Sequence, residues 1–158
     1  MDMLIKLYTP QAADAAGWHS TPDAHAVSLR KPIGPEHIAV ARWVGERFGT
    51  GWTSEVQVAL ANRPVSVWIA TRGAALLGFA CYDATARGFF GPIGVAETAR
   101  GQGLGSALLR ACLQDMRAAG YGYAIAGGVG APEFFRRTAG AIDIPDSSPG
   151  LYANQLTP

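Results

Sequence analysis

The sequence has few of the residues that mark metal, nucleic-acid and membrane proteins. It contains only two cysteines, Cys81 and Cys112, and no CxxC pair, which argues against a zinc site or a disulfide framework. It has no run of Lys and Arg, and its formal net charge is +1, so we expect no nucleic-acid partner. No apolar stretch approaches the roughly 18 residues of a membrane span. We therefore expect a cytoplasmic protein with no metal site and no membrane anchor.

The overall composition is that of an ordinary globular protein. Of the 158 residues, 49% are apolar and 16% are charged, and we treat residues 1–158 as a single domain. A domain of this length buries roughly 70% of the surface that its unfolded chain exposes. Both cysteines stand among aliphatic residues, so we expect them to be buried in that core rather than reactive.

The first part of the chain predicts a strand, a connector and two helices. Residues 1–26 combine a strand-like run with a small, polar connector, and 27–30 form a further short strand. A helix is predicted from about 35 to 48, and Ser54 with Gln57 has the spacing of a capping box at the start of a second helix. The apolar residues that recur at helical spacing in the first helix are Ile38, Ala41, Val44 and Phe48.

Three apolar runs at 66–71, 75–83 and 88–95 predict an antiparallel meander, after which the hydrophobic period changes. An amphipathic helix is expected over 103–119, followed by a strand at 122–127 that lies parallel to the strand before the helix. After that strand we expect a helix that begins at Pro132, and then two strands within AIDIP and GLYANQL. The fold class is therefore α/β, with a mixed sheet.

Three glycines stand at every second position where the long helix begins, in the stretch ETARGQGLGSALL at 97–109. Glycine lets a ligand approach the main chain, and the first N–H groups of a helix have no internal partner, so we expect an anion here. The stretch lacks the lysine of a Walker loop, and Ser106 replaces the third glycine of a dinucleotide fingerprint. The pattern that remains is Arg-x-x-Gly-x-Gly, read as Arg100, Gly103 and Gly105.

The segment GFFGPIGVAETARGQGLGSALL, from Gly88 to Leu109, resembles the acetyl-CoA-binding motif of the GNAT acyltransferase superfamily. The later segment PEFFRRTAGA is similar to the "FYxxxG" helix of that family, so the resemblance covers residues 88–141. It implies a mostly antiparallel sheet with a splayed parallel strand pair, and acetyl-CoA as cosubstrate. The pantetheine arm would lie between the splayed strands, with the Val95 N–H directed at the thioester carbonyl. The cofactor-binding residues that the resemblance implies are Ile93, Gly94, Val95, Arg100, Gly101, Gln102, Gly103, Leu104, Gly105, Ser106 and Phe135.

The sequence departs from the family pattern at two positions. Phe135 stands where many relatives have a tyrosine that protonates the departing thiolate, and Gly128 stands where an asparagine is common. Water or another tyrosine can supply the proton. The tyrosines that could stand in are Tyr82, Tyr121, Tyr123 and Tyr152.

The general base is not assigned by the sequence. Its candidates are Glu97, Asp83, Glu133 and Glu55, although each by itself is more typical of a solvated surface carboxylate. None of the three histidines, His19, His25 and His37, has a partner pattern, and none is given a role. Arg136 and Arg137 are candidates for the adenosine 3′-phosphate, and Trp43, Phe48 and Trp52 are either core residues or one wall of the acceptor pocket.

The resemblance implies an N-acetyltransferase that moves an acetyl group from acetyl-CoA to a primary amine of a small molecule by direct attack in a ternary complex. It allows a homodimer, because many relatives pair their sheets. A non-catalytic CoA-binding sensor or interaction module is the alternative, motivated by Phe135. A third reading is a structural protein whose glycine loop only packs the helix on the sheet. The sequence does not identify the acceptor.

Overall fold

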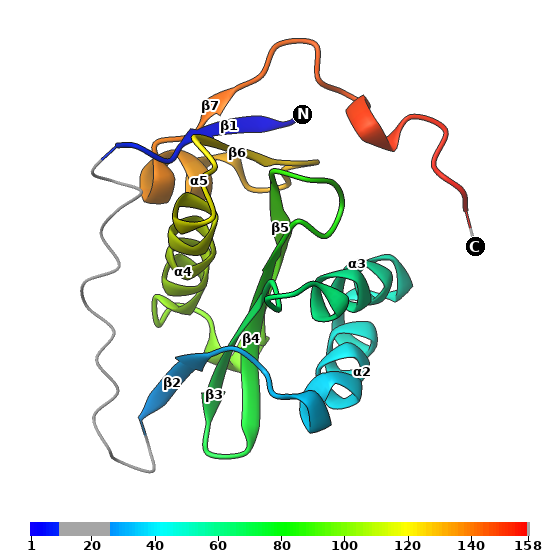
Figure 1. Ribbon diagram of the computed structural model, residues 1–158, viewed down its shortest axis with the longest axis vertical. Coiled ribbons are helices and arrows are strands. Elements are labelled where there is room, and N and C mark those ends of the chain that lie inside the picture. The colour runs from blue at the N-terminus through cyan, green and yellow to red at the C-terminus, as the bar shows by residue number, and fades with distance from the viewer. Residues whose placement is uncertain (10–25, 158) are drawn as a thin grey trace.

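A seven-stranded mixed sheet forms the centre of the computed structural model, which describes residues 1–9 and 26–157. The strands are β1 (Met3–Lys6), β2 (Val27–Arg30), β3 (Val67–Arg72), β4 (Ala75–Tyr82), β5 (Phe89–Val95), β6 (Tyr123–Ala126) and β7 (Ile142–Asp143). The helices are α2 (His37–Phe48), α3 (Thr50–Ala61), α4 (Leu104–Ala118) and α5 (Pro132–Ala139), with short 3-10 turns η1 (Gly34–Glu36), η2 (Glu97–Ala99) and η3 (Gly150–Tyr152). Helices α2 and α3 lie on one side of the sheet and α4 and α5 on the other (Figure 1).

The spatial order of the strands is β2-β3-β4-β5-β6-β1-β7, and it confirms the predicted fold class. Strands β3, β4 and β5 form the antiparallel meander, and β5 pairs with β6 in parallel across the α4 crossover. A parallel pair needs such a crossover connection, which α4 supplies. Among the described residues, no helix combines the length and apolarity that crossing a bilayer requires.

Two apolar clusters, one on each side of the sheet, form the core. The face of α4 predicted to be apolar is buried against the sheet, with Leu108, Cys112 and Met116 fully inaccessible. On the other side, α2 and α3 pack around Phe79. Cys81 and Cys112 are free and buried as expected, and burial raises the pKa of both thiols well above the usual range.

Three details of the predicted helices and strands are wrong. Helix α3 begins at Thr50 instead of near Ser54, because Gly49, at φ 93°, breaks the chain sharply after α2 and the new helix starts at once. The segment GLYANQL contains no strand: it forms the turn η3, since Gly150 adopts φ 59° and Tyr152 donates its N–H to the Pro149 carbonyl. Ile38 is 75% exposed, and Val40 lies on the buried face of α2 instead.

The N-terminal strand lies inside the sheet, between β6 and the short strand β7. It pairs antiparallel with both strands. Met3 lies opposite Ala126 of β6, and Leu4 lies opposite Ile142 of β7. The alternation of buried and half-buried residues along MLIK is the period-2 pattern of a strand with one face in the core. Strand β1 therefore joins β6 to β7, the strand that follows α5.

Candidate functional site

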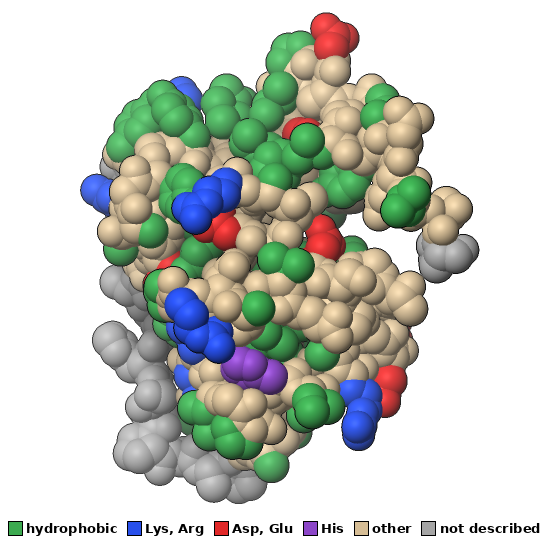
Figure 2. Space-filling view, turned by 45° about the vertical axis from the view of Figure 1, so that its right-hand side comes forward, with side chains coloured by type: hydrophobic (Ala, Val, Ile, Leu, Met, Phe, Trp, Pro, Cys, Tyr) green, Lys and Arg blue, Asp and Glu red, His purple; other side chains and the backbone are tan. Residues whose placement is uncertain are grey.

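Strands β5 and β6 separate after two residue pairs and leave a cavity of about 1200 Å³. They are paired at Phe89 with Ile125 and at Phe90 with Ala126, and β5 has no pairing with β6 from Gly91 onward. The cavity runs along the released edge of β5 as far as the start of α4. Figure 2 shows the surface hollowed between the C-terminal segment at the upper right and the helical part below it, with hydrophobic side chains gathered on the upper part of this face. The predicted V-shaped slot is thus present.

The released edge of β5 carries main-chain hydrogen-bonding groups at alternate residues. Ala96 donates its N–H to the Leu77 carbonyl of β4 at 2.8 Å, and β4 and β5 are in register from Gly78 opposite Val95 to Ala80 opposite Ile93. Peptide groups of successive strand residues point to opposite sides, so the N–H of Gly94 faces β4. The N–H groups of Ile93 and Val95 face the slot.

Gly94 is required by packing rather than as a donor to the slot. A Cβ at this position would lie 2.5 Å from Cζ of Phe48 and 3.0 Å from Cε1 of Phe79. Phe48 also stacks on Trp52, with ring centroids 4.9 Å apart. The glycine therefore lets the aromatic side chains of α2 and α3 approach β5 closely, and of these, Trp52 also lines the cavity.

The slot ends at a helix N-terminus with free donors. Gly103 precedes α4 in the left-handed conformation, at φ 79°, and no side chain caps the helix. Ala107 is the first residue whose N–H bonds back into the helix, to the Gly103 carbonyl, which leaves those of Leu104, Gly105 and Ser106 free of intrahelical partners. A Cβ at Gly101 or at Gly103 would meet no atom within 4 Å, so the space in front of the loop is open.

The side chains of the loop hold it beside the strands. Arg100 is exposed and donates from Nε to the Val95 carbonyl at 3.3 Å, and Gln102 accepts a bond from Arg72. Helix α4 lies close to α5 at Gly105, because a Cβ at this position would lie 3.6 Å from the Phe134 ring. Five of the cofactor-binding residues named from the sequence line the cavity, and Arg100 lines a separate groove. The five are Ile93, Gly94, Val95, Gly105 and Phe135.

A model of the acetyltransferase (GNAT) family matches residues 36–140, which is most of the chain. The chain belongs to the GNAT acetyltransferase family. A search of curated proteins found no match.

Solved structures of GNAT proteins share the fold. A GCN5-related N-acetyltransferase from Sphaerobacter thermophilus is 25% identical with a TM-score of 0.65, and the alignment covers 89% of this chain and 47% of that one. The glucosamine N-acetyltransferase region of a fungal multi-domain GH3 beta-N-acetylglucosaminidase is 11% identical with a TM-score of 0.63, covering 87% of this chain and 19% of that one. The chain thus spans about half or less of the length of these proteins.

The GNAT helix α5 presents phenylalanines to the cavity. Phe134 and Phe135 both line it, and Phe135 packs edge-on against Phe90 with centroids 5.9 Å apart, so no hydroxyl lies at this wall. Of the four tyrosines considered as substitutes, only Tyr152 lines the cavity. The other three lie elsewhere: Tyr82 is bonded to Asp115, Tyr121 to Asp83, and Tyr123 to Tyr8.

The candidate carboxylates are placed very differently from one another. Asp83 accepts the Gly88 N–H at 2.7 Å through one oxygen and the Tyr121 hydroxyl at 2.9 Å through the other, so it closes the turn before β5. Glu97 lines a separate groove of about 290 Å³, beyond the end of β5. Glu133 is exposed and forms an ion pair with Arg136. Among the described residues that line the main cavity, Glu55 is the only carboxylate.

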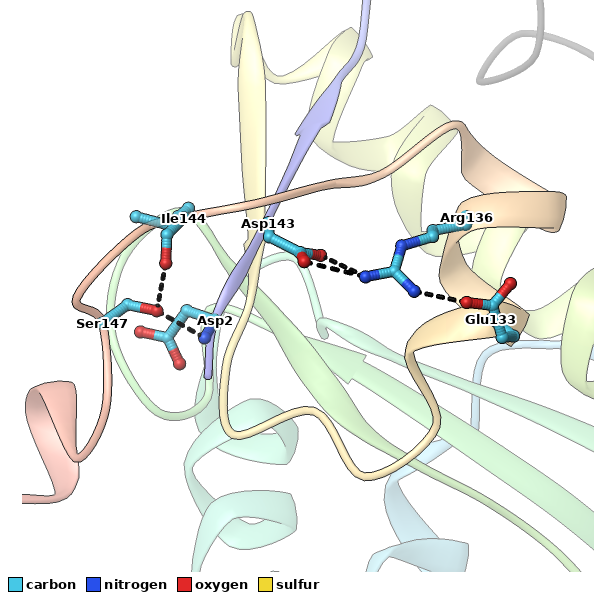
Figure 3. Close-up of polar contacts among 6 residues, drawn as sticks. All are labelled: Asp2, Glu133, Arg136, Asp143, Ile144 and Ser147. Carbon is cyan, nitrogen blue, oxygen red and sulfur yellow. Dashed lines mark hydrogen bonds and ion pairs between the residues drawn. The ribbon is translucent and has the colours of Figure 1, made fainter.

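The cavity is closed on one side by the segment that follows β7. Asp2 is 7% exposed and accepts the Gly128 N–H at 2.8 Å, and its own N–H donates to the Ser147 hydroxyl at 2.8 Å. Figure 3 shows that hydroxyl bonded in turn to the Ile144 carbonyl. Nothing in the sequence indicated this role, because a lone aspartate near the chain start has no distinguishing spacing. The N-terminal residues thus hold the loop after β6 and the C-terminal segment together.

The remaining polar candidates are occupied, exposed or outside the described residues. Arg136 binds both carboxylate oxygens of Asp143, at 2.7 and 2.8 Å, as well as Glu133 (Figure 3), while Arg137 is exposed. His19 and His25 lie outside the residues that the structure describes. In the part of the chain that is described, no group of three or more His, Cys, Asp or Glu side chains could hold a metal ion.

Proposed function

We propose that this protein is an acetyl-CoA-dependent N-acetyltransferase whose acceptor is a primary amine of a small molecule. The amine attacks the thioester directly in a ternary complex, with no covalent intermediate on the protein. Such a reaction needs positioning of the two substrates, a polarised carbonyl and the removal of one proton, and main-chain groups can supply much of this.

The observation that carries the proposal is the continuous line of free main-chain donors. The N–H groups at the start of α4 suit a pyrophosphate, because unpaired donors and the positive end of the helix dipole both favour an anion. The slot-facing N–H groups of Ile93 and Val95 continue the line and suit the amides and the thioester of a pantetheine arm. A donor on the thioester carbonyl, assigned here to Val95, is worth about 2.7 to 4 kcal/mol in comparable oxyanion sites.

The second candidate function is a protein that binds CoA without transferring an acyl group. One observation favours it: Phe134 and Phe135 present no proton donor at the wall of the cavity. This candidate requires affinity for CoA and no release of free thiol with any amine.

A thermal-shift titration with acetyl-CoA and with CoA, combined with a thiol-release assay over a panel of amines, tests the proposal. A ligand at 100 times its dissociation constant stabilises the folded state by about 2.7 kcal/mol, which raises the melting temperature measurably. Stabilisation together with thiol release supports the transferase. Stabilisation without release from any amine favours the CoA-binding protein, and the absence of stabilisation overturns both and favours a purely structural glycine loop.

A further inference from the structure

The cavity has a second end, beyond the slot, that is built from side chains. Helix α3 forms one side of it with Trp52, Glu55 and Val58, and the C-terminal segment forms the other with Leu151 and Tyr152. Apart from Glu55, the side chains that line the cavity among the described residues carry no charge at neutral pH. This end therefore offers one negative charge among uncharged side chains, of which Trp52, Val58 and Leu151 form apolar walls.

Glu55 is held by a hydrogen bond from a segment that is distant in sequence. It accepts a hydrogen bond from the hydroxyl of Thr85, which lies in the loop between β4 and β5. Tyr152 of the C-terminal segment lies close enough for Thr85 and Glu55 both to affect the pKa of its hydroxyl. The Tyr152 oxygen reaches the edge of the slot, since a Cβ at Gly127 would lie 2.8 Å from it. Helix α3 and the β4–β5 loop thus direct polar groups to one point, and Tyr152 of the C-terminal segment lies near it.

The titratable groups near Glu55 stay neutral at neutral pH. Burial raises the pKa of Tyr152 above its usual value, and the nearby Glu55 adds to that shift. Burial likewise raises the pKa of the Cys81 thiol, which lies in the core, and the negative charge of Glu55 raises it further. Asp2, which also raises the pKa of Tyr152, accepts the Gly128 N–H and is not among the residues that line the cavity. Glu55 is therefore the carboxylate that an acceptor in this end would meet.

On the basis of the proposed function, we propose that Glu55, positioned by Thr85, binds the ammonium group of the acceptor and accepts its proton. The free amine then attacks the thioester carbonyl carbon: the C–N bond forms, the C–S bond breaks, and the nitrogen loses a second proton as the CoA sulfur gains one. One net proton leaves for solvent through Glu55. The apolar walls and the single negative charge select a primary amine with an apolar body and no neighbouring carboxylate.

Glu55→Gln tests the role of the carboxylate, with phenethylamine as the acceptor. Removal of a general base costs typically 10² to 10⁴-fold, so we expect kcat/KM to fall at least about 100-fold while the thermal shift with acetyl-CoA is unchanged. Glu46→Gln, an exposed carboxylate of α2 outside the cavity, is the matched control and should retain full activity.

Substitutions at Thr85 test the positioning role separately. Thr85→Val removes the hydroxyl and should lower kcat about 10-fold, whereas Thr85→Ser keeps the hydroxyl and should restore kcat. If Thr85→Val and Thr85→Ser behave alike, Thr85 does not position Glu55. If the wild type transfers acetyl to phenethylamine and Glu55→Gln does so equally well, the assignment of Glu55 is overturned and the proposed function stands.

The choice of acceptor is tested with phenethylamine and phenylalanine, which differ only by a carboxylate beside the amine. We expect the wild type to prefer phenethylamine at least about 10-fold in kcat/KM, because phenylalanine would bring a second negative charge beside Glu55. Equal rates, or a preference for phenylalanine, overturn the inferred acceptor class. A wild type that binds no CoA and releases no thiol with any amine overturns the proposed function itself.

Discussion

The two ends of the cavity are built in different ways. The slot between β5 and β6 and the loop before α4 present main-chain N–H groups of residues that are close together in sequence. The opposite end presents side chains that come from α3, from the loop after β4 and from the C-terminal segment. A main-chain site depends on glycines and strand geometry, whereas a side-chain site depends on how distant segments meet. We therefore expect the main-chain site to keep its ligand when neighbouring side chains are substituted. In the side-chain site, a single substitution is enough to change the ligand.

The largest expected effect is at the main-chain end, in Gly103→Glu. The glycine adopts φ 79°, which strains any other residue, and the new carboxylate would stand where we expect the pyrophosphate. We expect complete loss of both the CoA-dependent thermal shift and acetyl transfer. Gly73→Glu is the control, because Gly73 also has positive φ, at 56°, and open space, but lies in the β3–β4 turn. If both variants bind CoA as the wild type does, the loop is not the phosphate site.

The main-chain end could be predicted from the sequence because its determinants are local. The glycine spacing, the preceding strand and the amphipathic helix lie within about thirty residues, and each has a physical meaning without knowledge of the rest of the chain. The splay between β5 and β6 came from resemblance to relatives. Which N–H groups face the slot required the register of β4, which one strand cannot reveal: Gly94 turns its N–H toward β4, and its need for glycine comes from Phe48.

The side-chain end was hardly predictable, because its determinants are far apart in sequence. Glu55 could be named as one of four carboxylates, but only the fold separates it from Asp83, which is used in a turn. Tyr152 lies in a segment predicted to be a strand that forms a turn instead. The bonds of Asp2 connect the first residues with the loop after β6 and the segment after β7, and no local pattern encodes such contacts.

Gly94→Val tests the boundary between the two ends. The new side chain would overlap the Phe48 ring, and overpacking of this kind costs typically 1 to 3 kcal/mol. We expect a lower midpoint of urea unfolding and weaker binding of both substrates, since β5 and the aromatic side chains of α2 and α3 would move apart. Gly51→Ala in α3, where a Cβ meets no atom within 4 Å, should not be destabilising. A Gly94→Val variant of full stability would show that the aromatic contact is not tight.

Asp2→Ala is expected to affect the side-chain end only. It would leave the Gly128 N–H without its acceptor in a partly buried site, which costs about 1 to 3 kcal/mol. With the C-terminal segment less firmly held, KM for the amine should rise several-fold while the CoA-dependent thermal shift persists. Asp2→Asn keeps an oxygen at the same position and should retain most of the stability. An equal loss of CoA and amine binding would show that Asp2 supports both ends.

The smallest expected effect lies outside both ends, at the ion pair between Arg30 and Glu36 at the start of α2. The Arg30 guanidinium and the Ile33 N–H lower the pKa of Glu36 to about 2, from its usual 4.5. A lowered pKa stabilises the folded state above the unfolded-state pKa, and the stabilisation is lost as the pH falls from about 4.5 toward 2. Because both side chains are partly exposed and screened by solvent, Glu36→Gln should cost less than about 1 kcal/mol at pH 7 and progressively less below pH 4.5. Urea unfolding of both proteins across this range measures the difference, and acetyl transfer should not change. A difference in stability that grows toward acid would contradict the ion-pair assignment. A change in the rate of acetyl transfer would show that the residues at the start of α2 influence the cavity.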